Sequence, residues 1–216
     1  MTTYTEIAKR IAKIIISPDT AIGLTHGVLS VPQDLGYLAY GYFDTDSRFN
    51  RETERIRLIN AIRFGILQNE NFVRTIETVL ENFNQYVPEN NRDGLYAKTG
   101  ASVVGRAITN SLISKKIATS IAQRSSLMIA LRGGVVGNIL LAGGMAERSI
   151  YRSQRLQMTD PDIYYELRKK DYDFLYFLVE PALQPFIEAL RVRRTQGNTA
   201  FNQIIELVEK EVRYGR

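Results

Sequence analysis

The chain has no cysteine and only one histidine, His26, among its 216 residues. The lack of cysteine excludes disulfides and thiol chemistry, and with a single histidine it excludes thiolate and multi-histidine metal sites. The absence of cysteine fits a reducing cytosol, and it fits equally a chain that crosses a cell envelope without forming wrong disulfides. His26 lies in a glycine-flanked apolar stretch, and we interpret it as structural. We expect no metal and no cofactor.

Acidic residues are scarce in the middle of the chain. The formal charge of +5 is the sum of −2 over 1–91, +8 over 92–155 and −1 over 156–216, and Asp93 and Glu147 are the only acids of the middle segment. A block that avoids acids indicates a polyanionic partner such as lipid headgroups or nucleic acid. The alternative that stays open is a solvated basic face that pairs with the acidic flanks.

No long hydrophobic run is free of both charge and glycine. The most apolar stretch, Ser125 to Ala146, spans 22 residues with one charge, Arg132, and five glycines. About 20 residues cross a bilayer, but arginine at mid-bilayer costs about 2.5–3.5 kcal/mol on insertion scales. The stretch therefore predicts a glycine-rich apolar helical hairpin that turns at Arg132-Gly133-Gly134. Whether it enters lipid or packs inside a core stays open.

Apolar residues recur at helical spacing along most of the remaining chain. The pattern predicts helices over about 3–17, 50–68 and 70–86 and a last helix after Asn198. In the first helix the isoleucines at 7, 11, 14 and 15 are expected to point inward, and in the second those at 56, 59, 62 and 66. Asp160-Pro161 is typical of a helix start. Pro181 is expected to end one helix and Pro185 to start the next.

These patterns predict an all-α, multi-helix bundle of about eight to ten helices, with no persuasive strand alternation. We divide it into an N-terminal helical part, 1–91, and a helical part, 92–216, that contains the basic glycine-rich segment 92–155. A single domain is the alternative. Val87 to Gly94, with a proline, two asparagines and a glycine, is the best candidate boundary.

Two motifs suggest chemistry and are better explained by structure. Asp44-Thr45-Asp46 with Glu52 lacks the glycine and the third acid of a calcium-binding EF-hand loop, so a capped turn is the preferred interpretation. Gly133 to Gly137 lacks the strand–helix–strand context and the ribose-binding acid of a dinucleotide site, so close helix packing explains its glycines better. We expect no catalytic residue.

The basic block suits lipid better than nucleic acid. No aromatic residue lies between Tyr96 and Tyr151, so bases have no stacking platform there. Near an anionic bilayer each Lys or Arg contributes about 1 kcal/mol. We expect six side chains to contact anionic lipid: Lys98, Arg106, Lys115, Lys116, Arg124 and Arg132. The membrane-insertion candidates are Leu127, Met128, Ile129, Leu131, Gly133, Gly134, Val135, Val136, Gly137, Ile139, Leu140 and Leu141.

A cysteine-free, many-helix chain that contains a weakly hydrophobic hairpin resembles pore-forming colicin domains in its overall arrangement across about 95–180. It also resembles small type VI secretion effectors that permeabilise the bacterial inner membrane. The resemblance lies in this layout and includes no diagnostic motif. The resemblance implies an antibacterial toxin used in bacterial competition, which moves ions through a membrane pore without covalent chemistry. It also implies a dedicated immunity or chaperone protein, and it allows the toxin to form oligomers.

The N-terminus lacks a convincing secretory signal, because Pro18 and Asp19 interrupt the apolar run of Ile14 to Ile16. We therefore expect a chain that is soluble in the producer's cytoplasm and is exported without the general secretory route to act at a target cell's inner membrane. The alternative function is a soluble helical interaction protein of immunity or adaptor type.

Overall fold

Helices make up the fold. The computed structural model describes residues 3–18, 36–37, 39–41, 43–95, 111–119 and 143–214, and no strand occurs among them. The labelled elements are α1 (Tyr4–Ile16), α4 (Arg48–Arg63), α5 (Asn69–Asn84), α6 (Glu89–Leu95), α10 (Gly144–Thr159), α11 (Pro161–Arg168), the 3-10 turn η2 (Tyr172–Phe174), α12 (Tyr176–Gln196) and α13 (Asn198–Tyr214). A further helix covers 111–119. The all-α, multi-helix prediction is confirmed.

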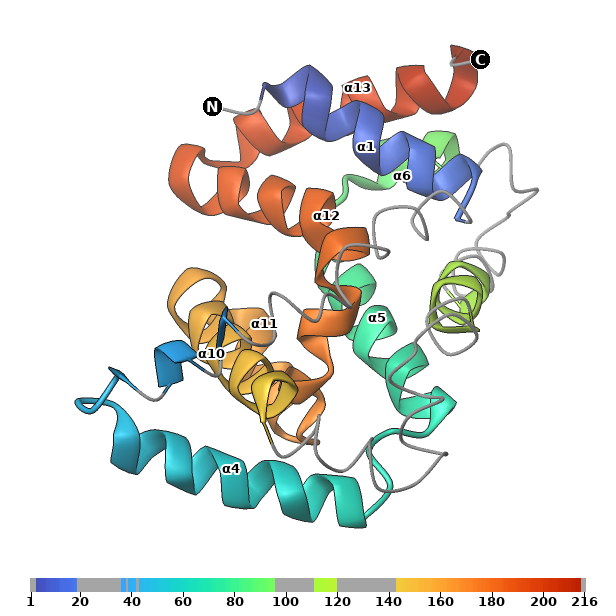
Figure 1. The fold of residues 1–216 in the computed structure, drawn as a ribbon. Helices are drawn as coiled ribbons and strands as arrows, with labels where there is room; N and C mark the ends of the chain where they lie inside the picture. The colour runs from blue at the N-terminus through green and yellow to red at the C-terminus, as the bar shows by residue number, and fades with distance from the viewer. Residues whose placement is uncertain are drawn as a thin grey trace.

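The first and last helices pack against each other in the upper part of the molecule (Figure 1). Thr3 caps α1 by accepting a hydrogen bond from the backbone N–H of Glu6, and the four predicted isoleucines of α1 are buried. The apolar face of α13 meets them with buried Ile204, Ile205 and Val208. Each helix is amphipathic and buries only one face, so each shields the apolar face of the other from water.

Helix α12 runs from the lower part of the molecule to the upper part and joins them (Figure 1). The expectation that Pro181 ends a helix and Pro185 starts another is wrong, because α12 continues through both. Each proline removes one backbone donor of the helix. Neighbouring Ala182, Leu183 and Phe186 are buried in the core, and this tertiary packing compensates for the missing hydrogen bonds. α12 ends at Gly197, whose φ of 89° suits glycine, and α13 starts at the next residue.

Two other positions that the sequence singles out can be located in the structure. Position 91, the proposed boundary between the two parts, lies inside α6. Asp160 does precede α11, with Pro161 in its first turn, but its side chain makes no capping hydrogen bond. Its carboxylate instead pairs with Arg191, at 3.0 Å, and with Arg194, both on α12. The residue that was predicted to cap α11 thus links the start of α11 to α12 through ion pairs.

Helix α4 lies along the lower edge of the molecule, and its orientation corrects the sequence prediction (Figure 1). Of the four isoleucines expected to point inward, Ile56 and Ile59 are exposed, whereas Ile66 is buried and Ile62 packs against the core. Leu58 and Ala61 are its buried apolar residues, and Arg51 is buried beside them. The reason is tertiary, because buried carboxylates on α10 and η2 attract the charged face of α4 inward.

No helix in the described ranges combines the length and the apolar character needed to cross a membrane. The predicted glycine-rich hairpin lies outside those ranges, except for its last residues. Of these, Met145 and Ala146 belong to α10 and are buried in the core.

Candidate functional site

A network of charged side chains connects the inner face of α4 to α10, α11 and η2. At its centre Arg57 binds Asp173 with two hydrogen bonds, of 2.9 and 2.5 Å, and Asp171 with a third, of 2.6 Å. Asp173 is fully buried and also accepts a hydrogen bond from Ser153. Glu54, one turn from Arg57, binds Arg168 at 2.9 Å. Every carboxylate of this centre therefore has an arginine partner.

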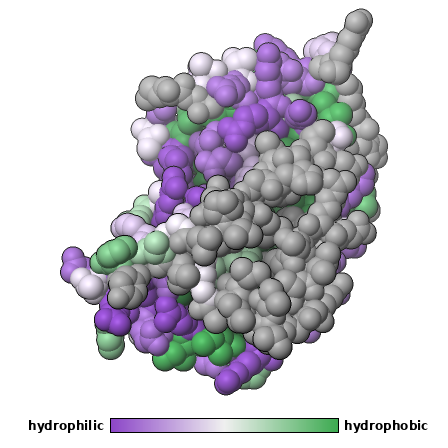
Figure 2. Space-filling model, viewed as in Figure 1, coloured by the Kyte–Doolittle hydropathy of each residue, from purple (hydrophilic) through white to green (hydrophobic). Residues whose placement is uncertain are grey.

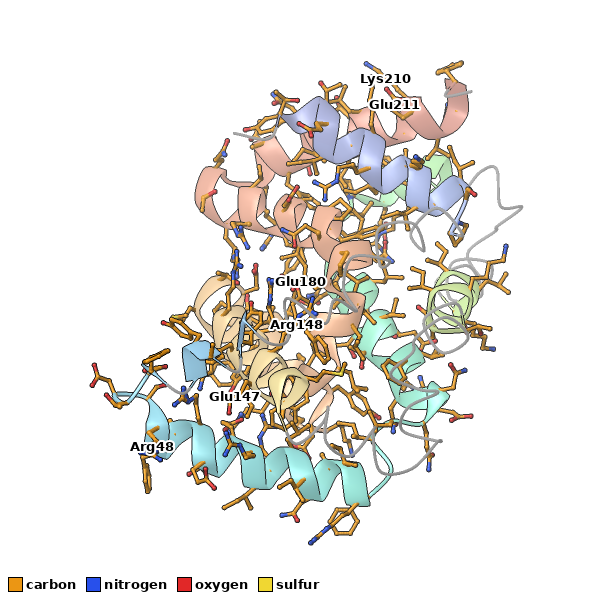
Figure 3. The ribbon with its side chains drawn as sticks, in the orientation of Figure 1. Arg48, Glu147, Arg148, Glu180, Lys210 and Glu211 are labelled. Atoms are coloured by element: carbon orange, nitrogen blue, oxygen red, sulfur yellow. The ribbon has the colours of Figure 1, made fainter. Side chains whose placement is uncertain are left out.

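A second group of contacts ties the start of α4 to α10. Arg51 donates to the backbone carbonyl of Gly41 at 2.8 Å and lies 3.3 Å from the carboxylate of Asp44. The Tyr151 hydroxyl of α10 donates to the same carboxylate at 2.7 Å. Glu147, also on α10, is buried and pairs with Arg55 (Figure 3).

Gly41 packs closely on this network. A Cβ at this position would lie 2.8 Å from Oε2 of Glu147. A side chain at position 41 would therefore push against a carboxylate that is already paired.

The charges of the network shift the pKa of several members. Hydrogen bonds from Ser47 and Tyr151 lower the pKa of Asp44. Burial opposes ionisation of Glu54, but hydrogen bonds from Arg168 and Arg57 outweigh it and lower the pKa of that carboxyl. Burial, together with the hydrogen bond to Asp44, raises the pKa of Tyr151 to about 12. Asp44 and Glu54 are therefore held ionised, and the Tyr151 phenol is held neutral.

This network braces the fold, and most of its groups pair with one another. Arg51 Nε, Arg55 Nε and Glu147 Oε2 are buried without a hydrogen bond in the described part of the chain, and the first and last of these atoms lie 3.9 Å apart. The cavity beside it measures about 30 Å³ and is lined by apolar side chains, including Leu58, Met145 and Phe174. That volume is about one water molecule. Within the described ranges, no group of three or more acids or histidines could hold a metal ion. The expected capped turn at Asp44 is confirmed, because Asp44 accepts hydrogen bonds from the backbone and hydroxyl of Ser47.

Most of the sequence-predicted site residues lie outside the described ranges. These are His26, the twelve insertion candidates between Leu127 and Leu141, and Lys98, Arg106, Arg124 and Arg132. Lys115 and Lys116 are described, and both are exposed on the helix at 111–119. Neither forms an ion pair with any part of the chain that the structure describes. Ile113, Ile117 and Ala118 anchor that helix in the core.

Two further arginines of the basic block are used inside the fold, whereas Arg155 is exposed on α10. Arg148 is buried on α10, with its guanidinium over the ring of Phe177. Arg152 pairs with Glu180 of α12 at 3.1 Å, so the acidic flank does meet the block at this point. Figure 3 shows Arg148 and Glu180 where α10 and α12 meet. Sequence alone could not separate these internal cations from the exposed lysines, because all belong to one acid-poor segment.

Comparison with known proteins gives no family for the chain: no family model matches it, and no curated protein or solved structure is significantly similar to it.

We expect the free energy of unfolding to fall in acid, because of the charge network. The folded-state pKa values of Asp44 and Glu54 lie below the ordinary 3.8 and 4.5. Their contribution is therefore complete above pH 4.5 and is lost as the pH falls through the lowered values. Urea unfolding at pH 7, 4 and 3 measures this loss. Glu54→Gln should flatten the acid limb, and an unchanged slope in that variant would refute the assignment to Glu54.

Proposed function

We propose that the protein is a membrane-active antibacterial effector. In this proposal it acts at a competitor's inner membrane and permeabilises it to ions, without covalent chemistry. An immunity or chaperone protein would shield the producer. The observation that supports this most directly is the pair of exposed lysines at 115 and 116, set on a helix that the core holds in place.

Anionic lipid is the partner that this arrangement suits. Two adjacent lysines near an anionic bilayer contribute about 1 kcal/mol each. Their helix buries three apolar residues, so the lysines are presented by a fixed surface. Leu112, beside them, is also exposed and adds an apolar contact. Acidic residues, which would repel such a surface, are absent from the sequence between Gly94 and Ala146.

Vesicle binding tests the proposal. The parent protein should sediment with vesicles that contain phosphatidylglycerol, and much less with vesicles of phosphatidylcholine alone. Lys115→Gln with Lys116→Gln should weaken partitioning about thirtyfold at low salt, from about 1 kcal/mol for each charge. Raising the salt should reduce the difference, since the Debye length falls to about 8 Å at physiological ionic strength.

A second adjacent pair provides the matched control. Lys169 and Lys170 are exposed at the end of α11, and Lys169 is already paired with Glu166 at 2.7 Å. Lys169→Gln with Lys170→Gln removes the same charge and should weaken binding much less. If the two double variants weakened binding equally, Lys115 and Lys116 would contribute only through net charge and not as a specific contact site. No binding of the parent to either vesicle would refute the proposal.

Expression in bacteria provides the functional readout. Induction of the parent in the presence of a membrane-potential dye should cause rapid depolarisation. A constant potential would refute permeabilisation and favour the second candidate, a soluble helical interaction protein. That candidate has its own support in the ion pair between Arg152 and Glu180, which uses a cation of the basic block inside the fold.

A further inference from the structure

Helix α4, together with Phe64, which directly follows it, presents large apolar side chains to solvent along its outer side. Phe49, Ile56, Ile59 and Phe64 have exposed fractions of 82%, 57%, 45% and 89%. We call these four residues the α4 apolar face. They lie at helical spacing along one side of the molecule's edge, where Figure 2 shows hydrophobic atoms gathered. Single exposed apolar residues are ordinary in proteins, but four large ones on one side, even with exposed Thr53 and Asn60 between them, favour a contact surface.

The charge network prevents α4 from rotating this face into the core. Such a rotation would separate Arg57 from Asp173 and Arg55 from Glu147, and it would leave two buried carboxylates without these arginine partners. Breaking one buried pair costs about 3–5 kcal/mol. The outward direction of the α4 apolar face is therefore imposed by the fold, and the face is held rigidly.

Positive charge borders the α4 apolar face. Arg48 and Arg63 are exposed at its two ends, and neither makes an ion pair within the described ranges. Figure 3 shows Arg48 at one end of the helix. Glu52 is the one exposed carboxylate on α4, and Arg55 pairs with it at 3.2 Å. Apolar side chains with cationic ends match a bilayer, which offers hydrocarbon below a layer of anionic phosphate.

We propose that the α4 apolar face is the surface by which the protein docks on an anionic phospholipid bilayer, with α4 parallel to the membrane plane. Phe49, Ile56 and Phe64 enter the boundary between headgroups and acyl chains. Arg48 and Arg63 contact phosphates. The 16 residues of α4 span about 24 Å and lie flat without leaving the fold. This inference rests on the proposed membrane function and adds a contact surface to the one that Lys115 and Lys116 provide.

A triple variant, Phe49→Ser with Ile56→Ser and Phe64→Ser, tests the contact. All three side chains are exposed, so the melting temperature should stay near that of the parent. Partitioning to phosphatidylglycerol vesicles should weaken by about tenfold or more, from the lost apolar burial. The matched control is Met158→Ser with Tyr214→Ser, which removes apolar side chains that are 78% and 79% exposed on α10 and α13. It should bind like the parent.

The cysteine-free chain allows a direct readout of position. Ile56→Cys, labelled with an environment-sensitive fluorophore, should shift its emission to the blue when anionic vesicles are added. Tyr214→Cys, labelled in the same way on α13, should not shift. Arg48→Gln with Arg63→Gln should weaken binding to anionic vesicles more than binding to neutral ones.

The outcomes separate this inference from the proposed function. If the parent fails to bind any vesicle, both are refuted. If the parent binds and the triple variant binds equally, or the probe at position 56 stays in water, the docking surface is refuted and the membrane function survives. If the probe shifts without vesicles, in proportion to protein concentration, the face contacts a second copy of the chain and the lipid assignment is refuted. Sedimentation velocity identifies that case.

Discussion

Replacing Arg57 with alanine is expected to lower the free energy of unfolding by about 3–5 kcal/mol, because the change leaves Asp173 buried with only Ser153 as its partner. The guanidinium also lies 3.7 Å from the centre of the Phe174 ring, so a cation–π contact is lost as well. For a chain of this length the melting temperature should fall by roughly 6–20 °C. Urea unfolding followed by circular dichroism measures the loss directly.

An exposed arginine serves as the control. Arg74 pairs with Glu77 on α5 at 2.9 Å, but its side chain is 69% exposed. Arg74→Ala should change stability by less than about 1 kcal/mol, as for most surface pairs. If Arg57→Ala had an equally small effect, the network would not hold α4.

A double variant separates the pair from its burial. Arg57→Met with Asp173→Leu replaces the ion pair by apolar groups, and such replacements of buried pairs are often neutral. We expect it to recover much of the stability lost in Arg57→Ala. Additive losses in the double variant would show instead that the wider network, including Glu54 and Asp171, depends on these charges.

Replacing Phe83 with alanine should have an effect of the same size, about 3–5 kcal/mol, for a different reason. Phe83 of α5 is fully buried, and its ring lies 5.2 Å from that of Phe186 on α12 and 5.6 Å from that of Phe201 on α13. Its removal leaves a cavity where three helices meet. Thermal melting and urea unfolding should both report the loss.

The controls for Phe83 vary burial and shape. Phe83→Leu keeps most of the volume and should cost much less than alanine. Phe49→Ala removes a phenyl ring that is 82% exposed, and it should change stability by about 0.5 kcal/mol or less. A similar loss for Phe49→Ala and Phe83→Ala would contradict the burial on which both the core and the α4 apolar face depend.

Helices whose apolar residues all face one way could be predicted from sequence. The stripes of α1, α5 and α13 are buried as expected, with Ile7 and Ile11, Phe72 and Ile76, and Ile204 and Val208 among them. Hydrophobic burial acts on each helix locally, so the 3.6-residue period records which face turns inward. The preference of Gly197 for a positive φ, which ends α12, is equally local.

Contacts between distant residues could not be predicted in this way. Arg57 and Asp173 are 116 positions apart, and no periodicity relates them. Because that pair and its neighbours draw the charged side of α4 inward, Ile56 and Ile59 point outward, against the expectation from spacing. Likewise, core packing carries α12 through two prolines. Local sequence thus determined where most helices form, whereas pairing of buried charges across the fold decided which side of α4 faces solvent.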